Sequence, residues 1–396
     1  PPTRSGAGVL QRYLDTFDEV VGGLVEVAGP LVTTVSGGLD STFLAAGLSL
    51  HCPRGQQVYG FCHSPLPEAG LPPIGRFEPD DYPYAQLMAE HYPGVLTVTA
   101  LRNEARVHPL DAAAAAYRSS GWPGLAPTND VWINAFLDNA RRLGARLHFV
   151  GAQGNATFSA NHAYASRHYL DAGRPVAAVR SALSGPGGPV RRALRLAAHR
   201  IRPPRPAGSA GSARTRIGLI GAVPPRGEGG EISRTHFLRW ATSRINGWPG
   251  AMNPARAPGL LAADPFAARS VIETAASIEP FEWRRGSAGR ALARRLGRGR
   301  VPERIRTRTT RGAQDWDAWF VVRSDLPRLV AEVEEAAGDE LVRGILDRSV
   351  LDAWLDQARE RPATGAQPPE TEVVLQFLAA VRYARWLQIQ LPNAGV

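Results

Sequence analysis

The spacing of hydrophobic positions changes several times along the first 150 residues, and each change predicts a new element. Apolar residues at helical spacing predict an amphipathic helix over 9–28. The short β-branched run at 31–35, bounded by proline and glycine, predicts a buried strand. The same criteria predict further strands at 57–62, 95–98 and 147–150 and helices at about 41–50, 84–91 and 131–143. Strands that alternate with helices indicate an α/β fold, a doubly wound parallel sheet with helices on both faces.

The second half of the chain has a different pattern. Beyond 234 we expect no strand, and helical spacing recurs at about 265–278, 287–297, 326–336, 339–345, 348–360 and 370–390. Proline, glycine, serine and arginine dominate 203–230 and predict a flexible loop there. These changes divide the chain into an N-terminal helix at 1–28, an α/β core at 29–180, an Arg/Pro/Gly-rich insertion at 181–235 and a helical portion at 236–396.

Every basic residue is an arginine, because the 396 residues include 46 lysine-plus-arginine positions and none of them is lysine. This excludes a Schiff base, a lysine general base and a Walker-type phosphate lysine. The formal charge is +10, but 180–235 and 281–311 each hold eleven arginines and two glutamates, so the remainder carries 10 − 18 = −8. Local anion sites fit this pattern better than a nucleic-acid-binding protein, and a nucleic-acid or acidic-peptide site in 180–235 is a weaker alternative.

Other compositional features narrow the class of protein. Cys52 and Cys62 are too few for a disulfide framework and lack the spacing of a zinc site, which favours the cytoplasm. No apolar run reaches the roughly 18 residues of a membrane span, and the start of the chain has no signal-peptide core. A first residue other than methionine suggests a domain cut from a longer chain.

The most informative segment is the run SGGLDST at 36–42, which lies between a predicted strand and a predicted helix. Its two glycines let the backbone approach an anion, and the amides that open the helix point toward it. The hydroxyls of Ser36, Ser41 and Thr42 are further donors. Asp40 places a carboxylate where Mg²⁺ bridging phosphates would bind. The segment therefore predicts a phosphate site that needs no lysine.

This run resembles the pyrophosphate loop (PP-loop) of ATP pyrophosphatases, and specifically the synthetase domain of asparagine synthetases and their relatives, the β-lactam synthetases and lasso-peptide cyclases. Three later stretches resemble further family motifs in the expected order: LHFVGAQGNATF at 147–158, DPFAARSVIETAASIEP at 264–280 and RRLGRGRVPERIRTRTTRG at 294–312. The last resembles a run in which L-P-x-x-[IV]-x-x-R-x-K-x-G is fixed. The resemblance spans about 30–390 and implies an ATP- and Mg²⁺-dependent ligase that adenylates a carboxylate, releases pyrophosphate and joins the acyl group to ammonia or an amine.

The resemblance also implies roles for individual residues. Asp40 and Asn155 would bind the metal, and Asp40 and Arg311 would be catalytic. Residues implied to contact the nucleotide are Thr34, Ser36, Gly37, Gly38, Leu39, Asp40, Ser41, Cys62, Val150 and Gly151. Thr34, Cys62 and Val150 are equally compatible with ordinary strand and core positions.

Departures from the family pattern leave the reaction open. Asn155 replaces an aspartate, Ala156 follows where the family has an acid, and Ala152 replaces a Glu or Tyr near the reacting amine. Arg311 stands approximately where the family has a lysine; arginine binds phosphate but, with a pKa above about 12, cannot shuttle a proton. The leading expectation stays an amide-forming synthetase of the asparagine synthetase type, acting on a small-molecule or peptide carboxylate, with an upstream or separate glutaminase if ammonia is the amine donor. The changes point slightly toward the first alternative, a specialised cyclase or amide ligase of the lasso-peptide or β-lactam type; a nucleotide-binding pseudo-enzyme is the second alternative.

Three smaller features have simpler interpretations. The acidic stretch at 78–81 predicts a solvated loop with Asp81 as the N-cap of the next helix. The aromatic run at 316–320 is typical of helix packing. His162 and His168 could meet substrate or belong to a solvated polar cluster, and none of the nine histidines has the metal-binding spacing H-E-x-x-H.

Overall fold

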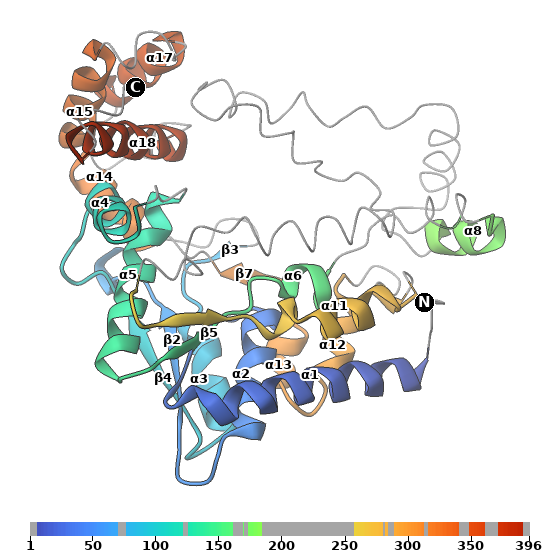
Figure 1. The fold of residues 1–396 in the computed structure, drawn as a ribbon. Helices are drawn as coiled ribbons and strands as arrows, with labels where there is room; N and C mark the ends of the chain where they lie inside the picture. Colours follow the sequence, from blue (N-terminus) through green and yellow to red (C-terminus); the bar gives the residue numbers. More distant parts are fainter. Residues whose placement is uncertain are drawn as a thin grey trace.

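The structure is a computed structural model that describes residues 6–69, 77–121, 126–160, 169, 173–183, 257–279, 282–283, 289–312, 316–339, 348–360 and 371–390. A parallel sheet with its covering helices forms one part, and a group of helices packs at one end of it (Figure 1). Predictions for His162, His168, most of the insertion at 181–235 and the helix at 339–345 fall outside the described residues.

The central sheet has five parallel strands in the order β4-β2-β1-β5-β6. Their bounds are β1 Leu31–Thr34, β2 Val58–His63, β4 Leu96–Leu101, β5 Leu147–Phe149 and β6 Leu261–Ala263. Leu31 and Val35 belong to the core on one face and Val32 to the core on the other, as alternation along a strand requires. The α/β fold with a parallel sheet, predicted from the alternation of strands and helices, is confirmed.

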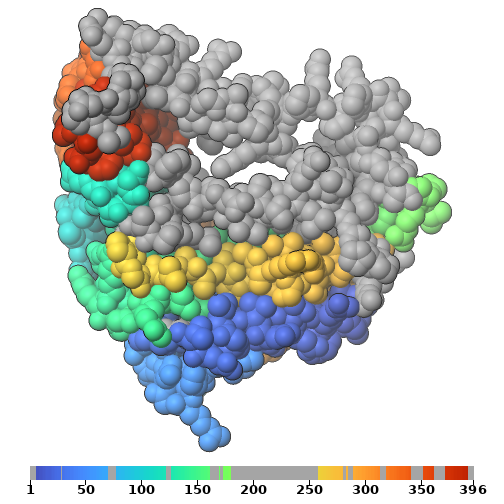
Figure 2. Space-filling view, in the orientation of Figure 1, coloured from blue at the N-terminus to red at the C-terminus, as the bar shows by residue number. Residues whose placement is uncertain are grey.

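Helices cover one face of the sheet with a core rich in aromatic rings. These helices are α1 Ala7–Ala28, α2 Leu39–His51, α3 Tyr82–His91, α11 Arg269–Ala276 and α12 Ala291–Leu296, with the short turn η4 at Pro265–Ala267. Phe43 stacks on Phe158 at 4.3 Å between ring centroids and also packs near Phe17. Figure 2 shows α1 lying along the 257–279 segment, and the hydroxyls of Thr16 and Thr274 meet there at 3.4 Å. The predicted helix at 265–278 is therefore η4 followed by α11.

The opposite face is covered mainly by α5, Pro127–Arg142. Its buried residues Ile133, Phe136 and Leu137 follow helical spacing and pack against Phe61 of β2 and Leu101 of β4. Thus α2, which follows β1, covers one face of the sheet, and α5, which precedes β5, covers the other. Neither layer covers the carboxyl ends of the strands.

The helical group has its own core. It consists of α4 Pro109–Ser120, α14 Trp316–Ser324, α15 Leu326–Gly338, α17 Arg348–Glu360 and α18 Thr371–Gln390. The predicted helices at 326–336, 348–360 and 370–390 are confirmed, and the aromatic run at 316–320 lies in α14. The helix α4 was not expected, because five consecutive alanines at 112–116 give no contrast between a buried and an exposed face. Further described helical segments are α8 Pro175–Leu183, whose Ala178 packs with Tyr169, and the single turns α6 Gly154–Thr157 and α13 Glu303–Arg306, of which α13 adds Ile305 to the core beneath α1 and α2.

The expectation of no strand beyond 234 is wrong. β6 pairs in parallel with β5, and β3, Phe77–Glu78, pairs in parallel with β7, Arg311–Gly312. β6 is a Leu-Ala-Ala segment without β-branched residues, and a two-residue strand has no period to detect. Only pairing with a distant strand defines these elements. Within the described residues, no helix has both the length and the apolar character needed to cross a bilayer.

Candidate functional site

The connection between β1 and α2 folds back on itself through its own hydroxyls. The backbone N–H of Ser36 donates to the Ser41 hydroxyl at 3.0 Å, and the two serine Oγ atoms lie 2.8 Å apart. The N–H of Gly38 donates to Ser36 Oγ at 3.2 Å. Thr42 does not add a donor as expected, because its buried hydroxyl bonds at 2.8 Å to the Gly38 carbonyl of its own helix. The segment 36–41 forms a tight strand-to-helix turn, the shape that a phosphate loop requires.

The other residues expected to contact a nucleotide come to the same edge of the sheet. Thr34 pairs with Phe61, the residue before Cys62, and the N–H of Val150 bonds to the Ala263 carbonyl at 2.9 Å. A methyl group built on Gly151 would lie 3.5 Å from the backbone of Asp40. The carboxyl ends of three neighbouring strands thus surround the loop, although contact with a nucleotide stays a prediction.

The side chains of Leu39 and Cys62 face the core and are not available to a ligand at the loop. Leu39 and Cys62 are both buried in the core that α1 and α2 share. Burial raises the pKa of the Cys62 thiol well above its usual value, so the group is an uncharged core side chain. Any contact of these two residues with a ligand at the loop therefore has to use main-chain atoms.

Asp40 faces a second loop, which follows β5. Its Oδ2 accepts a hydrogen bond from Ser159 Oγ at 2.9 Å, whereas Oδ1 is buried and bonds to no other described side chain. A methyl group on Gly154 would lie 2.6 Å from that Oδ1, so only glycine fits there. Burial raises the pKa of Asp40. The sequence motif predicted a role for Asp40, but no local pattern predicted that Gly154 and Ser159 would lie beside it.

A buried carboxylate oxygen without a partner suits a metal ion. Magnesium in nucleotide sites is held by one or two carboxylates, and substrate phosphates and water supply the other ligands. Asp40 Oδ1 fits that role. Asn155, the second expected ligand, follows Gly154 directly but is exposed, and its amide oxygen brings no charge. Across the described ranges no three His, Cys, Asp or Glu side chains gather into a metal cage, so phosphate oxygens would have to complete the coordination.

Asp264 ties the second loop to β6. Its carboxylate accepts hydrogen bonds from the N–H of Gln153 at 2.7 Å and the N–H of Phe266 at 3.0 Å. Burial raises the pKa of Asp264 to about 7, and the nearby Asp40 contributes to the rise. Within the segment 264–280, this carboxyl group holds the loop after β5 against the turn that follows β6.

Arg308 is the guanidinium that lies against the loop. A methyl group on Gly37 would collide with its Nη1, and its Cζ lies 3.8 Å from the ring centre of Tyr84. Nη1 donates to Asp81 Oδ1 at 2.6 Å, and Nη2 donates to Glu78 Oε2 at 2.8 Å. The side chain is only 5% exposed. The sequence prediction gave this residue no role, although the fixed arginine of the family run, counted from Pro302, falls on Arg308.

Arg311 lies three residues further on, in β7, and is exposed. Counting from Pro302 in the family run places Thr310, rather than Arg311, at the lysine position. The Thr310 hydroxyl donates to Glu78 Oε1 at 2.7 Å and accepts from Arg308 Nε at 2.8 Å. The catalytic role of Arg311 stays a prediction, while the structure places Arg308 closer to the loop's backbone.

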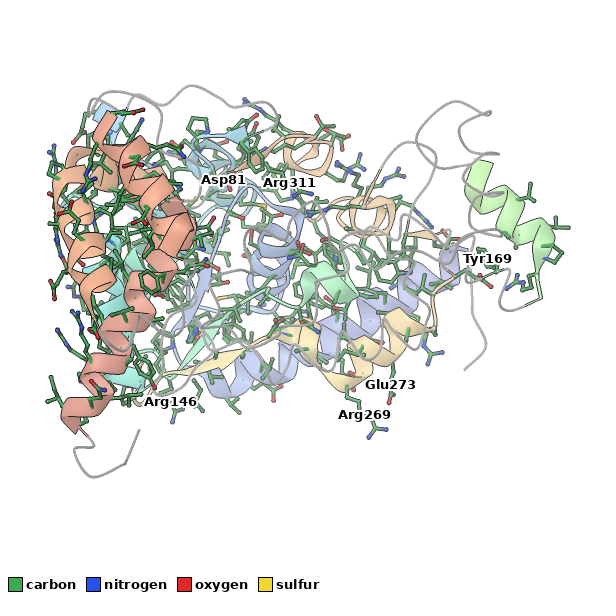
Figure 3. The ribbon with its side chains drawn as sticks, turned by 90° about the horizontal axis from the view of Figure 1, so that it is seen from above. Asp81, Arg146, Tyr169, Arg269, Glu273 and Arg311 are labelled. Atoms are coloured by element: carbon green, nitrogen blue, oxygen red, sulfur yellow. The ribbon has the colours of Figure 1, made fainter. Side chains whose placement is uncertain are left out.

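Asp81 is the N-cap residue of α3, as predicted, but it is not solvated. It is buried, it makes no capping bond to α3, and Asp80 instead accepts from the N–H of Tyr82 at 2.9 Å. Its carboxylate accepts from Arg308 and lies against Gly37, on which a Cβ would be 2.8 Å from Oδ1. Burial raises the pKa of Asp81, and Arg308 opposes that rise. Figure 3 shows Asp81 and Arg311 side by side, where β3 meets β7.

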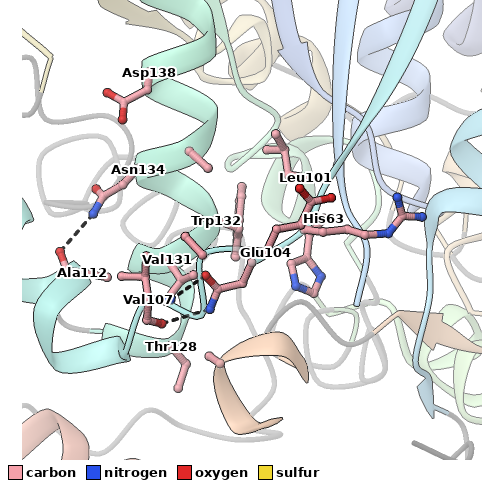
Figure 4. Close-up of a pocket in the computed structure, with 15 residues that line it drawn as sticks. His63, Leu101, Glu104, Val107, Ala112, Thr128, Val131, Trp132, Asn134 and Asp138 are labelled. Carbon is pink, nitrogen blue, oxygen red and sulfur yellow. Dashed lines mark hydrogen bonds between the residues drawn. The ribbon is translucent and has the colours of Figure 1, made fainter. Parts of the chain in front are cut away.

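A cavity of about 360 Å³ lies beyond the carboxyl ends of β2 and β4, against α5 (Figure 4). Its walls include His63, Leu101 and Trp132. Burial lowers the pKa of His63 to about 4, which leaves the imidazole neutral at pH 7. Asn103 fixes one rim by bonding to both backbone groups of Val107, at 2.8 and 2.9 Å. Because β2 adjoins β1, this cavity lies one strand away from the loop at 36–41.

Comparison with known proteins bears on the whole chain. A search of curated proteins found no match. A family model described as asparagine synthase matches residues 12–388, which include both cores, the loop at 36–41, Asp264 and Arg308. The family uses ATP, and the match supports an enzyme of the ATP-dependent ligase kind. The extent of the match, together with the parallel sheet and the geometry around Asp40, makes this chain a member of the asparagine synthase family.

Proposed function

We propose that the chain is an ATP- and Mg²⁺-dependent synthetase that adenylates a carboxylate and then forms an amide bond. The observation that carries the proposal is Asp40, at the start of the helix that follows the two-glycine loop; its buried Oδ1 has no hydrogen-bond partner among the described residues and faces Gly154 of the second loop. Burial raises the pKa of this carboxyl group more than the charge of Arg290 lowers it, so its ionised form is costly and a further cation would stabilise it. A bound Mg²⁺ would supply charge neutralisation to the phosphates.

The proposed reaction has two balanced steps. First, a carboxylate oxygen of the substrate attacks the α-phosphorus of ATP, the bond between the α- and β-phosphates breaks, and pyrophosphate leaves. Second, an amine nitrogen attacks the acyl carbon, the bond to AMP breaks, and the nitrogen loses a proton. The amides of Gly37 and Gly38 would bind the leaving pyrophosphate, and Arg308 would balance its charge. Arginine cannot accept the amine's proton, so a base other than arginine has to take it.

The branch of the family to which the chain belongs depends on which carboxylic acid is activated and which amine attacks it. Ala152 and the absence of lysine favour a specialised amide former that closes a ring within a peptide or a β-amino acid derivative, since such a reaction needs no ammonia. Asparagine formation would instead require ammonia from an upstream or separate glutaminase. In either case we place the reaction in the cytoplasm, where ATP is available and the two cysteines stay reduced.

Product analysis tests the proposal directly. The purified chain is incubated with MgATP and a panel of carboxylic acids and amines, and nucleotides are separated by anion-exchange chromatography. We expect AMP and pyrophosphate in equal amounts, formed only when a suitable acid is present. Formation of ADP and inorganic phosphate would contradict adenylation, because the bond broken would then be the one to the γ-phosphate.

The pseudo-enzyme alternative rests on a specific observation, the exposed Asn155 in place of a second carboxylate. It predicts binding of ATP by calorimetry without AMP across the whole panel. Substitution Asn155→Asp separates the two ideas: in a working enzyme it should change the Mg²⁺ concentration needed for half-maximal AMP release, whereas in a pseudo-enzyme it should yield no AMP.

A further inference from the structure

The loop already lies against an anionic group of the same chain. A Cβ on Gly37 would lie 2.8 Å from Asp81 Oδ1, and the Gly37 backbone opposes the rise that burial causes in the pKa of Asp81. The same Oδ1 accepts from Arg308 Nη1 at 2.6 Å. Backbone of the loop and a guanidinium, the two kinds of group that recognise phosphate, therefore both lie beside one carboxylate.

The position of Asp81 is built by distant parts of the chain. A methyl group on Gly312 would collide with the Asp81 carboxylate, so the absence of a side chain in β7 makes room for it. β7 pairs with β3, which ends at Glu78, three residues before Asp81. Asp81 also directly precedes α3. The carboxylate is therefore enclosed by a strand pair and a helix, in contrast to a side chain on a free loop.

The charge balance at this point opposes anion binding. Arg308 meets both Asp81 and Glu78, so the three groups sum to −1 when both carboxylates are ionised. A phosphate oxygen cannot lie beside both Gly37 and Arg308 Nη1 while the Asp81 carboxylate is there, because like charges at contact repel. Glu78 does not have this conflict, because it binds the other side of the guanidinium, Nη2.

We propose that Asp81 is an internal anion that occupies part of the phosphate site and is displaced when pyrophosphate binds. An entering phosphate oxygen takes the Gly37 amide and Arg308 Nη1, Asp81 turns away, and Glu78 keeps Arg308 in place through Nη2. The return of Asp81 would then assist release of pyrophosphate after adenylation. The identity of the anion rests on the proposed function.

The test measures binding of inorganic pyrophosphate to the full chain by titration calorimetry, with Mg²⁺ and at fixed ionic strength. In Asp81→Asn we expect binding about tenfold tighter or more, the equivalent of one charge-assisted hydrogen bond no longer competed for. Glu78→Gln is the matched control, because it removes the same charge from the same guanidinium without touching Gly37. We expect it to change the dissociation constant less than about threefold.

A second variant displaces the carboxylate without changing charge. Gly312→Ala places a methyl group against Asp81 and should also tighten binding, and circular dichroism checks that each variant is folded. Equal tightening in Asp81→Asn and Glu78→Gln would overturn the inference, because a general charge effect would then explain both. Weaker binding in Asp81→Asn would also overturn it. If the wild type and every folded variant fail to bind pyrophosphate, the proposed function fails too, whereas unchanged binding in Asp81→Asn rejects the displacement alone.

Discussion

Arginine has different roles at the loop and in the helical group. In the helical group, Arg359 of α17 pairs with Glu334 of α15 at 2.5 Å, and the two side chains are 55% and 47% exposed. At the loop, Arg308 pairs with Asp81 at 2.6 Å, and those side chains are 5% and 8% exposed. The two distances are nearly equal, so distance does not distinguish the pairs. The exposed fraction of their side chains does distinguish them.

Burial changes what each pair contributes. Exposed pairs add only about 0–1 kcal/mol, because water screens them and two long side chains must be ordered. Removing one partner of a buried pair costs about 3–5 kcal/mol, because a charge is left without compensation. The arginine-rich composition therefore has little functional meaning by itself, whereas Arg308, which the fold encloses beside the loop, has a specific role.

The largest expected effect is that of Asp40→Asn on activity. Loss of the carboxylate should lower acid-dependent AMP release about 10²–10³-fold, as removal of one charge-stabilising group does in other enzymes. The same substitution should make the folded protein more stable at high pH. Burial raises the pKa of Asp40, so the wild type is destabilised as pH rises through that folded-state value, and the uncharged variant escapes this loss. Thermal melts at pH 5 and pH 8 measure it.

The control for this variant is Asp356→Asn, which alters a carboxylate on the exposed surface of α17. It should change neither AMP release nor the melting temperature appreciably. An Asp40→Asn protein that releases AMP at the wild-type rate would show that the reaction at the loop does not need this carboxylate.

The next effect concerns the two arginines near β7. Arg308→Ala should lower the free energy of unfolding by about 3–5 kcal/mol, because Asp81 and Glu78 would lose their shared cation. Arg311→Ala should lower it by less than about 1 kcal/mol, because its side chain is exposed. Urea denaturation of both variants gives the comparison. Equal losses would remove the distinction between the buried and the exposed arginine.

A smaller effect is expected in the pH dependence of stability. Burial raises the pKa of Asp264 to about 7, whereas the unfolded carboxyl titrates near 4. The stabilising proton is therefore present in the folded state at low pH and is lost as pH rises through 7, so the wild type should lose stability between pH 5 and 8. Asp264→Asn should flatten this slope in urea titrations at several pH values. An unchanged slope would assign the dependence to another group.

The smallest effect is that of breaking an exposed pair in the helical group. Arg359→Ala should lower the free energy of unfolding by less than about 1 kcal/mol and leave pyrophosphate binding unchanged. Calorimetry and urea denaturation measure the two quantities. A loss of several kcal/mol would mean that exposed arginine pairs hold this group together.

Local sequence predicted the parts of the fold that local forces decide. The β1 strand, the glycine loop and α2 have strong short-range signals, and Thr34, Cys62 and Val150 meet at one edge because parallel strands share a direction. β6 and the β3–β7 pair were missed, because a strand of two or three residues exists only through its distant partner. The same limit applies to α4, whose alanine run lacks contrast.

The candidate site divides in the same way. Asp40 was predicted because its motif is contiguous in sequence. Asp81 was expected in solvent, and it is buried because Arg308, 227 residues later, brings a compensating charge. Glycine is required at 154 and 312 only because the carboxylates of Asp40 and Asp81 fill the space beside them. Sequence spacing could not supply these contacts, since each joins segments that meet only after the sheet has formed.

Exchange of labelled pyrophosphate into ATP tests the proposed chemistry at the loop most directly. With an acid that supports AMP release, the wild type and Mg²⁺ should transfer ³²P from pyrophosphate into ATP, because adenylation is reversible while pyrophosphate stays at the site. Omission of the acid, omission of Mg²⁺ or the Asp40→Asn substitution should each suppress the exchange. Acid-dependent exchange that persists in Asp40→Asn, or its absence from a wild-type protein that binds MgATP in the presence of the full acid panel, would contradict adenylation at this loop.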